Sequence, residues 1–445
     1  MYIKSRRFIE WKSVWIVLAL SLCTGFSAQA QDTLHLSLQQ AIALGLQNSK
    51  ELKIARARVQ EALLRFKQAK DAMLPSAKIS YGASEAFIPT RELVFGRDTL
   101  HLPGRSRLYL GTLSIQEPIF AGNQLRYARA SAEILEKIAA LDTADYRNQL
   151  TNAVIQTYGN LLKIIGNQQV VAQNIEDIQQ RLIETRHFEE QGLATQNDVL
   201  RFQLQLSDAQ LTALDLENNR KIVNYNLNIL LGLPDTTEIM PDSFSQALPL
   251  QPMETYLQMA LQQRKDLQAF QYRLQLNDLQ IKQEKDTRLP TLGLGVSGYY
   301  INPNNDFFPP KNTYLAPITV GLTLGWNISS LYTAPHRIAE AEVQRTETAL
   351  QQSILTDQIK EDIHQQYRSY QLALQRIKVL QVALAQAEEN DRMMESKYRN
   401  QLASTTDRID AETLLFKARV DLRLAQVDAV LAYYQLLAAT GTLSQ

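Results

Sequence analysis

The sequence predicts a mainly helical protein with a small β portion, built from one structural unit that occurs twice. Three observations predict this fold class. Residues 336–440 contain neither glycine nor proline, and their apolar residues recur at steps of three and four, as on one face of a helix. In each half of the chain the pattern changes from a helical period to a strand-like one and back. Short sequences also recur in the same order at a nearly constant offset, which is typical of a duplicated unit.

Residues 1–30 have the features of a secretory signal peptide. Four basic residues precede an apolar run at residues 15–22, and Ala28-Gln29-Ala30 fits a cleavage site made of small residues. The apolar run is shorter than the ~20 residues that a membrane-spanning helix needs, so an uncleaved anchor is the weaker alternative. Cleavage after Ala30 would remove Cys23, the only cysteine, and leave a chain that forms no disulfide.

The charge balance and the scattered histidines exclude several classes of function. The whole chain carries 46 basic and 46 acidic residues, so its charge does not indicate a nucleic-acid partner. Its five histidines lack the spacing of paired metal ligands, so we expect no metal site. Neither a glycine-rich phosphate loop nor a nucleophile elbow occurs in the sequence. We therefore expect no cofactor and no enzymatic activity.

The repeated unit can be identified directly from short matches along the chain. Residues 46–52 match residues 261–267 at an offset of 215, and Gly232 matches Gly441 at an offset of 209. Because the matches keep their order, chance is a poor explanation for them. The two expected structural repeats are residues 31–247 and 248–445.

The first repeat should begin with a helix at about residues 38–73. Pro75 ends this helix because its ring blocks continuation. Two strands should follow, at about residues 76–87 and 108–116. A loop rich in proline, glycine and polar residues should join them.

The second repeat should have strands at about residues 291–300 and 314–328, followed by two long helices. The helical pattern lapses at residues 400–406 and then resumes. We therefore expect a very long helix, a turn, and a second helix that returns antiparallel to the first. At ~1.5 Å per residue, the roughly 65 residues before the turn would span on the order of 100 Å.

The last expected strand alternates strictly between two kinds of residue. From 314 to 326 the even-numbered residues are Tyr, Ala, Ile, Val, Leu, Leu and Trp, whereas the odd-numbered residues from 319 to 327 are Thr, Gly, Thr, Gly and Asn. A soluble hairpin with one buried face has this pattern. A transmembrane β-barrel strand has it too. Small residues opposite a full aliphatic row, with tyrosines near strand ends, favour the membrane strand.

A physical constraint then links the strands to an assembly. Four strands cannot close a barrel, and an open sheet edge in lipid would leave backbone groups without hydrogen bonds. If the strands span a membrane, several chains must share one barrel, and three copies would give twelve strands. The helices would close into a tube in the same way. A periplasmic coiled-coil scaffold or adaptor without a pore is the alternative, although it does not explain two hairpins in register with the duplication.

The two expected helical turns carry related sequences. The first reads Gly192-Leu193-Ala194-Thr195-Gln196-Asn197-Asp198-Val199, and the second runs from Tyr398 to Asp410. With the duplicated order of helix, Leu-Pro, hairpin, long helix, turn and helix, residues 36–443 resemble the TolC-type outer-membrane efflux protein (outer membrane factor) family.

The resemblance implies a homotrimer in the cell outer membrane. It would have a 12-stranded β-barrel in outer-membrane lipid and a long α-helical barrel in the periplasm. It also implies passive export of substrates from an inner-membrane pump of RND, ABC or MFS type through a periplasmic adaptor (membrane fusion protein).

The resemblance further implies that Tyr398, Asp198, Asp407 and Asp410 form a periplasmic entrance to the pore. A local role is also open for two of these carboxylates. Thr195 followed by Asp198, and Ser404 followed by Asp407, have the spacing of a capping box that starts a helix. Asp410 has no such local explanation.

The two turns should contact the adaptor. The expected contact residues are Gly192, Leu193, Ala194, Thr195, Gln401, Leu402, Ala403 and Ser404. The family commonly has glycine at both turns, and Gln401 replaces the second one. An arginine that can join the entrance network in the family would fall on Ala403, so an entrance here would lack that cation.

Overall fold

The computed structural model describes residues 33–87, 89, 92–101, 105–243, 249–303 and 314–443. The expected signal peptide, residues 1–30, lies outside these residues. The described chain divides into two compact units. Unit 1 comprises residues up to Ser49, Thr151–Leu248 and Gln371–Tyr433, and unit 2 comprises Lys50–Leu150, Pro249–Tyr370 and the residues from Tyr434. Each unit therefore contains parts of both expected repeats.

Unit 1 consists of long helices and a small parallel sheet. Its elements are β1 (Thr33–Leu36), α2 (Leu38–Asn48), α5 (Gln196–Leu231), β6 (Glu238–Pro241) and parts of α4 (Gln124–Glu190), α8 (Ser330–Arg399) and α9 (Thr405–Thr440). Strands β1 and β6 pair in parallel. Tyr158 of α4 fixes them, because its hydroxyl donates to the carbonyls of Leu36 at 2.8 Å and Asp242 at 3.0 Å.

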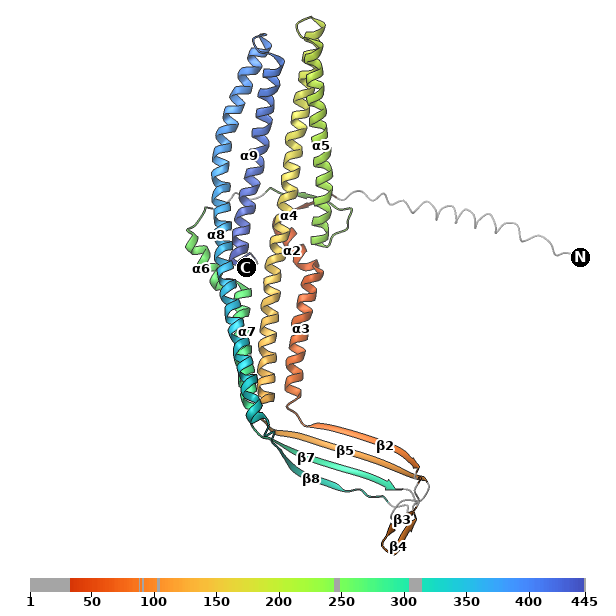
Figure 1. The fold of residues 1–445 in the computed structure, drawn as a ribbon. Helices are drawn as coiled ribbons and strands as arrows, with labels where there is room; N and C mark the ends of the chain where they lie inside the picture. The colour runs from red at the N-terminus through yellow and green to blue at the C-terminus, as the bar shows by residue number, and fades with distance from the viewer. Residues whose placement is uncertain are drawn as a thin grey trace, which may run out of the picture. The chain divides into compact units, whose positions relative to one another are not determined.

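Unit 2 combines helices with most of the β structure. Its elements are α3 (Lys50–Asp71), β2 (Ser76–Phe87), β3 (Glu92–Phe95), β4 (Asp98–His101), β5 (Arg105–Ala121), α6 (Met253–Gln263), α7 (Lys265–Asp286), β7 (Thr291–Pro303), β8 (Ile318–Gly325) and the remaining parts of α4, α8 and α9. Strands β2, β5, β7 and β8 pair in that order and antiparallel (Figure 1). We call them the main sheet. The prediction of a mainly helical chain with a small sheet is confirmed.

The register of the main sheet produces an apolar face. Ala77, Ile115, Val296 and Val320 form one row across its strands. Side chains two positions apart share a face of a strand. This face therefore also carries Ile79, Tyr81, Leu113, Leu292, Leu294, Leu322 and Leu324. Most of its side chains are exposed in the single chain, with Ile79 at 80% and Val320 at 70%, whereas Leu292 and Val296 are half-buried.

The opposite face of the main sheet is polar near Lys78, whereas further along it carries Leu108, Leu110, Tyr299 and Ile301. The neighbouring row consists of Lys78, Ser114, Ser297 and Thr319. In the next row the hydroxyls of Ser80 and Thr112 hydrogen-bond to each other at 2.6 Å. Residues 293–297 of β7 and 319–325 of β8 add only glycine, serine and threonine to this face. The alternation expected for the last strand is therefore present in β8, and the rows through Lys78 and through Ala77 continue it across the sheet.

The strand boundaries differ in part from the expected ones. Residues 76–87 form β2 as expected, whereas β5 and β7 are longer than predicted. The prediction that a strand begins at residue 314 is wrong, because β8 begins at Ile318. Pro317 has no N–H for the ladder, so pairing before it is limited to a bridge between Ile301 and Leu315. The loop between β2 and β5 also contains the β3–β4 hairpin, which was not predicted.

The expected helix at residues 38–73 is two helices. It breaks at Ser49, between α2 and α3. The break follows from a contact with α5: Asn48 Nδ2 donates to the carbonyl of Leu231 at 2.8 Å. Gly232, with φ of 66°, ends α5 there, and a Cβ on it would lie 2.7 Å from the Asn48 Cβ. A long-range bond therefore overrides the local helical pattern.

The second repeat has the same break. Helices α6 and α7 meet at Arg264, whose backbone is extended there. Its guanidinium donates to the carbonyl of Ala439 at 3.3 Å, beside Gly441 with φ of 77°. Gly232 and Gly441, which match in sequence, thus hold corresponding positions. In the described part of the chain, we find no helix with the length and apolar character needed to cross a membrane.

Candidate functional site

Each pair of long helices in unit 1 is joined by a tight turn, which we call a tip. The first tip, residues 191–195, joins α4 to α5, and the second tip, residues 400–404, joins α8 to α9 (Figure 1). Both lie where the sequence predicted turns. In the first tip the N–H of Leu193 donates to the carbonyl of Phe188 at 2.8 Å, and Gly192 has φ of 72°. A bond of this type around a left-handed residue is a Schellman motif.

The second tip has the same conformation without a glycine. The N–H of Leu402 donates to the carbonyl of Lys397 at 2.8 Å, and Gln401 has φ of 59°. A side chain in this left-handed region costs about 1–2 kcal/mol. The replacement of glycine by Gln401 therefore keeps the turn and adds strain to it.

Both tips end in a reciprocal cap. The Asp198 carboxylate accepts hydrogen bonds from the backbone N–H and the hydroxyl of Thr195 at 2.9 and 2.7 Å. Asp407 accepts the same two bonds from Ser404, at 3.1 and 2.7 Å. In each case the hydroxyl also accepts from the N–H of the aspartate. These are capping boxes, so the local role that the sequence left open for both aspartates is present.

The caps also keep the two carboxylates ionised. The Ser404 hydroxyl lowers the pKa of Asp407 by donating to it. Partial burial acts to raise the pKa of Asp198, but bonds from Thr195 and Thr405 outweigh it and the pKa is lowered. Both aspartates therefore carry a negative charge at neutral pH.

The two tips share a cleft of about 250 Å³. Its lining residues are Phe188, Leu193, Ala194, Asp198, Tyr398, Gln401, Ala403, Ser404 and Thr405. Tyr398 lies across it, with its ring edge-on to Phe188 at 6.4 Å and its hydroxyl 3.4 Å from that of Thr185. The structure thus brings predicted entrance residues and predicted adaptor-contact residues together in one place.

Other predicted site residues lie outside this cleft. Gly192, Thr195 and Leu402 are exposed on the tips, with Leu402 at 78%. Asp407 and Asp410 are exposed on α9, outside the cleft lining. Because they are three residues apart on a helix, they share one face. In a single chain this face is open.

A buried ionic cluster close to the tips in sequence was not predicted. Arg408 of α9 is 2% exposed and pairs with Asp391 of α8. Arg181 of α4 pairs with Glu395 of α8 at 3.1 Å. The ion pair of Arg408 and Asp391 links α9 to α8. The ion pair of Arg181 and Glu395 links α4 of one helical hairpin to α8 of the other. Movement of α8 against α9 or α4 near the tips would therefore separate these ion pairs, in which Arg408 is buried and the other three side chains are half-buried.

Glu412 completes this cluster beside a small cavity. The cavity, about 130 Å³, lies among α4, α8 and α9. Glu412 is 6% exposed, and neither its Oε2 nor the Nε of Arg408 has a hydrogen-bond partner among the described residues. Burial raises the pKa of Glu412, an effect that Arg408 and Arg181 oppose and that Asp391 and Asp177 reinforce.

One sequence signal could have identified this cluster. Thr405, Arg408, Glu412 and Leu415 recur at steps of three and four along α9, and all four are buried. Charged residues in the apolar positions of a helix are costly unless they are paired. Two of them four residues apart therefore indicate an interior ionic network.

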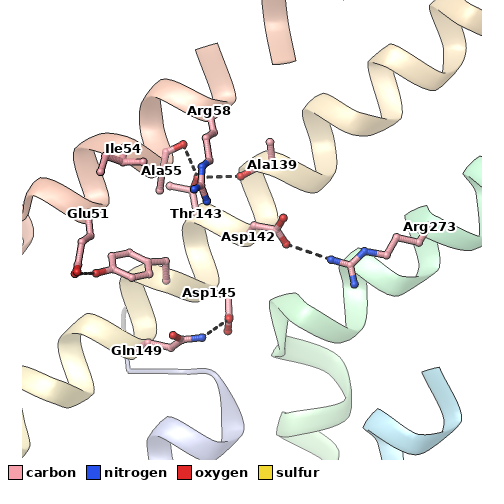
Figure 2. A pocket seen from close by; sticks show the side chains of 11 residues that line it. Glu51, Ile54, Ala55, Arg58, Ala139, Asp142, Thr143, Asp145, Gln149 and Arg273 are labelled. Carbon is pink, nitrogen blue, oxygen red and sulfur yellow. Dashed lines mark hydrogen bonds and ion pairs between the residues drawn. The ribbon is translucent and has the colours of Figure 1, made fainter. Parts of the chain in front are cut away.

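A groove in unit 2 has a structural role. It has a volume of about 610 Å³ and lies among α3, α4 and α7 (Figure 2). Its polar groups bind one another: Thr143 donates to the carbonyl of Ala55 at 3.2 Å, and Gln149 donates to Asp145 at 2.7 Å. We assign it to helix packing. Within the described residues, no group of three or more His, Cys, Asp or Glu side chains could hold a metal ion.

Comparison with known proteins gives a family match over most of the chain. A sequence model of the family described as "Outer membrane efflux protein" matches residues 41–233 and 256–442. The outer membrane efflux protein BepC of Brucella suis biovar 1 (strain 1330) is 24% identical over 441 residues. The match covers 96% of this chain and 90% of that protein.

Solved structures of outer-membrane proteins share the fold. The outer membrane protein VceC of Vibrio cholerae superposes with a TM-score of 0.76 at 19% identity, covering 91% of this chain and 96% of its own. The CmeC outer membrane channel of Campylobacter jejuni gives a TM-score of 0.76 at 15% identity, with 91% and 85% covered. The similarity therefore extends over nearly the whole chain.

Proposed function

The chain belongs to the outer membrane efflux protein family, and we propose that three copies of it form one channel. It is an outer-membrane channel protein with a long periplasmic helical part. The family and the fold are those of transport channels. In our proposal the channel is passive, and solutes reach it from an inner-membrane pump through a periplasmic adaptor.

The observation that carries the proposal is the main sheet. In β8 one face is aliphatic and exposed, and the other is made of threonine and glycine, and the paired part of β7 continues both faces. In a membrane barrel the aliphatic face would contact lipid and the polar face would contact the water of the pore, so each face would have a suitable environment. A pore-free periplasmic scaffold would leave the aliphatic face in water without a function.

The edges of the main sheet support closure by further copies. Among the strands that the structure describes, β2 and β8 are the outer ones of the main sheet, and each has one side without a partner strand. Unpaired backbone groups cost several kcal/mol each in lipid. If β8 of one copy pairs with β2 of the next, three copies satisfy every edge and give twelve strands. This is above the lower limit of about eight strands for a membrane barrel.

An exposed apolar stripe on α5 also supports contact between copies. Its members are Leu200, Leu204, Leu211, Leu214, Ile222 and Ile229, and their exposed fractions range from 49% to 67%. They recur at helical spacing along one face. In a closed ring, a helix of the neighbouring copy would cover this stripe.

We assign two functions to the tips. Asp198, Tyr398, Asp407 and Asp410 would form the periplasmic entrance. Leu193 and Leu402 would contact the adaptor, together with the neighbouring residues of both tips, because their apolar side chains are 53% and 78% exposed. Replacing Leu193 or Leu402 with aspartate should then abolish export while assembly and membrane insertion remain intact. Export that survives both changes would place the adaptor contact elsewhere.

The test of the membrane assignment compares two neighbouring residues of β8. Leu322→Arg would place a charge in hydrocarbon at a cost of ~2–4 kcal/mol, whereas Thr323→Arg would place it in the aqueous pore at much lower cost. The yield of assembled protein in outer membranes should be low for the first variant and close to wild type for the second. Equal yields, or the reverse order, would contradict the assignment of the faces.

A further inference from the structure

Lys78 is a cation on the polar face of the main sheet. It lies on β2 opposite Ser114 of β5, and the row continues through Ser297 and Thr319. The hydroxyl of Thr319 donates to the carbonyl of Ser297 at 3.3 Å, so this row is held by its own hydrogen bonds. The Lys78 side chain is exposed.

The charge of Lys78 has no counterpart on its face. Of the side chains that the structure describes in β2, β5, β7 and β8, it alone is charged at neutral pH on the polar face. Glu85 and Arg107, which lie 3.6 Å apart, belong to the opposite face by register. Glu117, paired with Leu294, belongs there as well. A cation among serine, threonine and glycine dominates the local potential.

We propose that Lys78 is a selectivity residue: three copies of it form a ring of ammonium groups in the membrane part of the pore, which favours anionic solutes. The inference rests on the proposed trimeric channel. It adds a charge preference of the pore that the family assignment does not contain.

The dimensions of the proposed barrel make such a ring effective. Twelve strands about 4.8 Å apart and tilted by about 40° give a diameter of roughly 24 Å between backbones. A lysine stem of about 6 Å brings each ammonium group to within about 6 Å of the axis. The screening length at physiological ionic strength is about 8 Å. A solute at this level therefore cannot avoid the field of the ring.

The experiment uses single cysteines beside Lys78 in the full chain, in a Cys23→Ser background. Ser114→Cys is the cross-strand neighbour of Lys78 on the polar face, and Leu113→Cys is the matched control on the apolar face. Each is combined with Lys78, Lys78→Gln or Lys78→Arg. Rates of reaction with two membrane-impermeant methanethiosulfonates, one carrying a sulfonate and one a trimethylammonium group, are measured in outer-membrane vesicles.

We expect Ser114→Cys to react with both reagents and to favour the sulfonate. One charge about 5 Å away in water changes each rate roughly fourfold without screening and roughly twofold at physiological ionic strength, in opposite directions, so Lys78→Gln should lower the sulfonate-to-ammonium ratio roughly fourfold or more. Lys78→Arg should keep the ratio. A nearby ammonium group also favours the thiolate, but this accelerates both reagents alike and cancels in the ratio.

The outcomes separate this inference from the proposed function. If Ser114→Cys reacts, Leu113→Cys is protected, and the ratio is the same with and without Lys78, the channel stands and the selectivity role of Lys78 is overturned. If Leu113→Cys reacts readily and Ser114→Cys is protected, the faces are reversed, and the proposed pore is wrong together with the inference.

Discussion

Arg408 of α9, with only 2% of its side chain exposed to solvent, forms an ion pair with Asp391 of α8, whose side chain is 16% exposed. Arg408 occupies a buried position of α9, where the helical pattern predicts an apolar side chain. Arg181 and Glu395 add a second bond from α4 to α8. The helices next to the tips are thus held by charges as well as by packing.

Removing one member of the Arg408–Asp391 pair should loosen α8 and α9 near the tips. Arg408→Met leaves Asp391, whose side chain is 16% exposed, without its partner, and the cost should be below the ~3–5 kcal/mol of a fully buried pair. Amide hydrogen exchange of both helices near the tips should therefore accelerate. Arg392→Met, which removes a solvent-exposed ion pair with Glu389 on the same helix, is the control and should leave exchange unchanged. Unchanged amide exchange in Arg408→Met would show that this ion pair does not hold α8 and α9 together near the tips.

Glu412 should make stability depend on pH. Its pKa is raised in the folded protein because burial disfavours the charged form. The contribution of Glu412 to the free energy of unfolding is therefore fully present below its unfolded pKa near 4.5. It is lost as the pH rises through the pKa of Glu412 in the folded protein. Glu412→Gln cannot ionise, so its advantage in thermal midpoint over wild type should grow from pH 4 towards neutral pH.

A matched variant checks the sign of this effect. Arg392 lowers the pKa of Glu389. The thermal midpoint of Glu389→Gln should therefore gain no advantage over that of wild type as the pH rises from 4 towards neutral. If the midpoints of Glu412→Gln and wild type stay parallel over this pH range, Glu412 binds protons equally in the folded and unfolded states, and burial does not raise its pKa.

Two glycines of α4 should respond oppositely to alanine. A Cβ on Gly159 would lie 2.4 Å from the Cδ2 of Leu431, a buried side chain of α9, and overpacking of this kind costs about 1–3 kcal/mol. A Cβ on Gly166 would lie 3.2 Å from the Nε of Arg423, a flexible side chain. Alanine is favoured over glycine within helices by about 1 kcal/mol. Gly159→Ala should thus lower the thermal midpoint, and Gly166→Ala should keep or raise it.

If both glycine variants behave alike, the close approach of α4 to α9 is not a determinant of stability. A double variant, Gly159→Ala with Leu431→Ala, gives a second check. The smaller side chain removes the clash, so this variant should fall short of the sum of the two single effects.

The entrance carboxylates should bind multivalent cations. In a trimer, Asp407 and Asp410 would place six carboxylates in one ring, and a constricted mouth strengthens their attraction for cations. Block of single-channel conductance by a trivalent cation from the periplasmic side should weaken in Asp410→Asn. The asparagine of Asp407→Asn keeps an oxygen for the cap with Ser404. Combining Asp407→Asn with Asp410→Asn should weaken the block further.

Asp208→Asn is the control for this block, because Asp208 is exposed on α5 away from the tips in sequence. It should be blocked at the wild-type concentration. If the double variant is also blocked at that concentration, Asp407 and Asp410 do not line the entrance, and capping is the sufficient explanation for Asp407.

Local signals predicted the features that local forces determine. Pro75 marks the end of the first helical region, and β2 begins at the next residue. The caps formed by Asp198 and Asp407 depend on residues three positions away, so their spacing in the sequence was sufficient. The strand faces follow from a period of two. These features needed no knowledge of distant contacts.

Long-range contacts determine what could not be predicted. The break at Ser49 depends on a bond from Asn48 to Leu231, 183 residues away. The burial of Arg408 depends on Asp391, which the tip brings back towards it. The last strand begins at Ile318 instead of residue 314 because Pro317 lacks an N–H. Pro317 is a local signal, but the prediction followed the strict alternation of residues instead.

The mass of the assembled protein tests the central claim most directly. Outer membranes should be solubilised in detergent and the intact species weighed by native mass spectrometry. The proposed channel predicts a single species of three chains, because only shared closure satisfies the edges of β2 and β8 in lipid. A monodisperse monomer, recovered from the soluble periplasmic fraction, would contradict it.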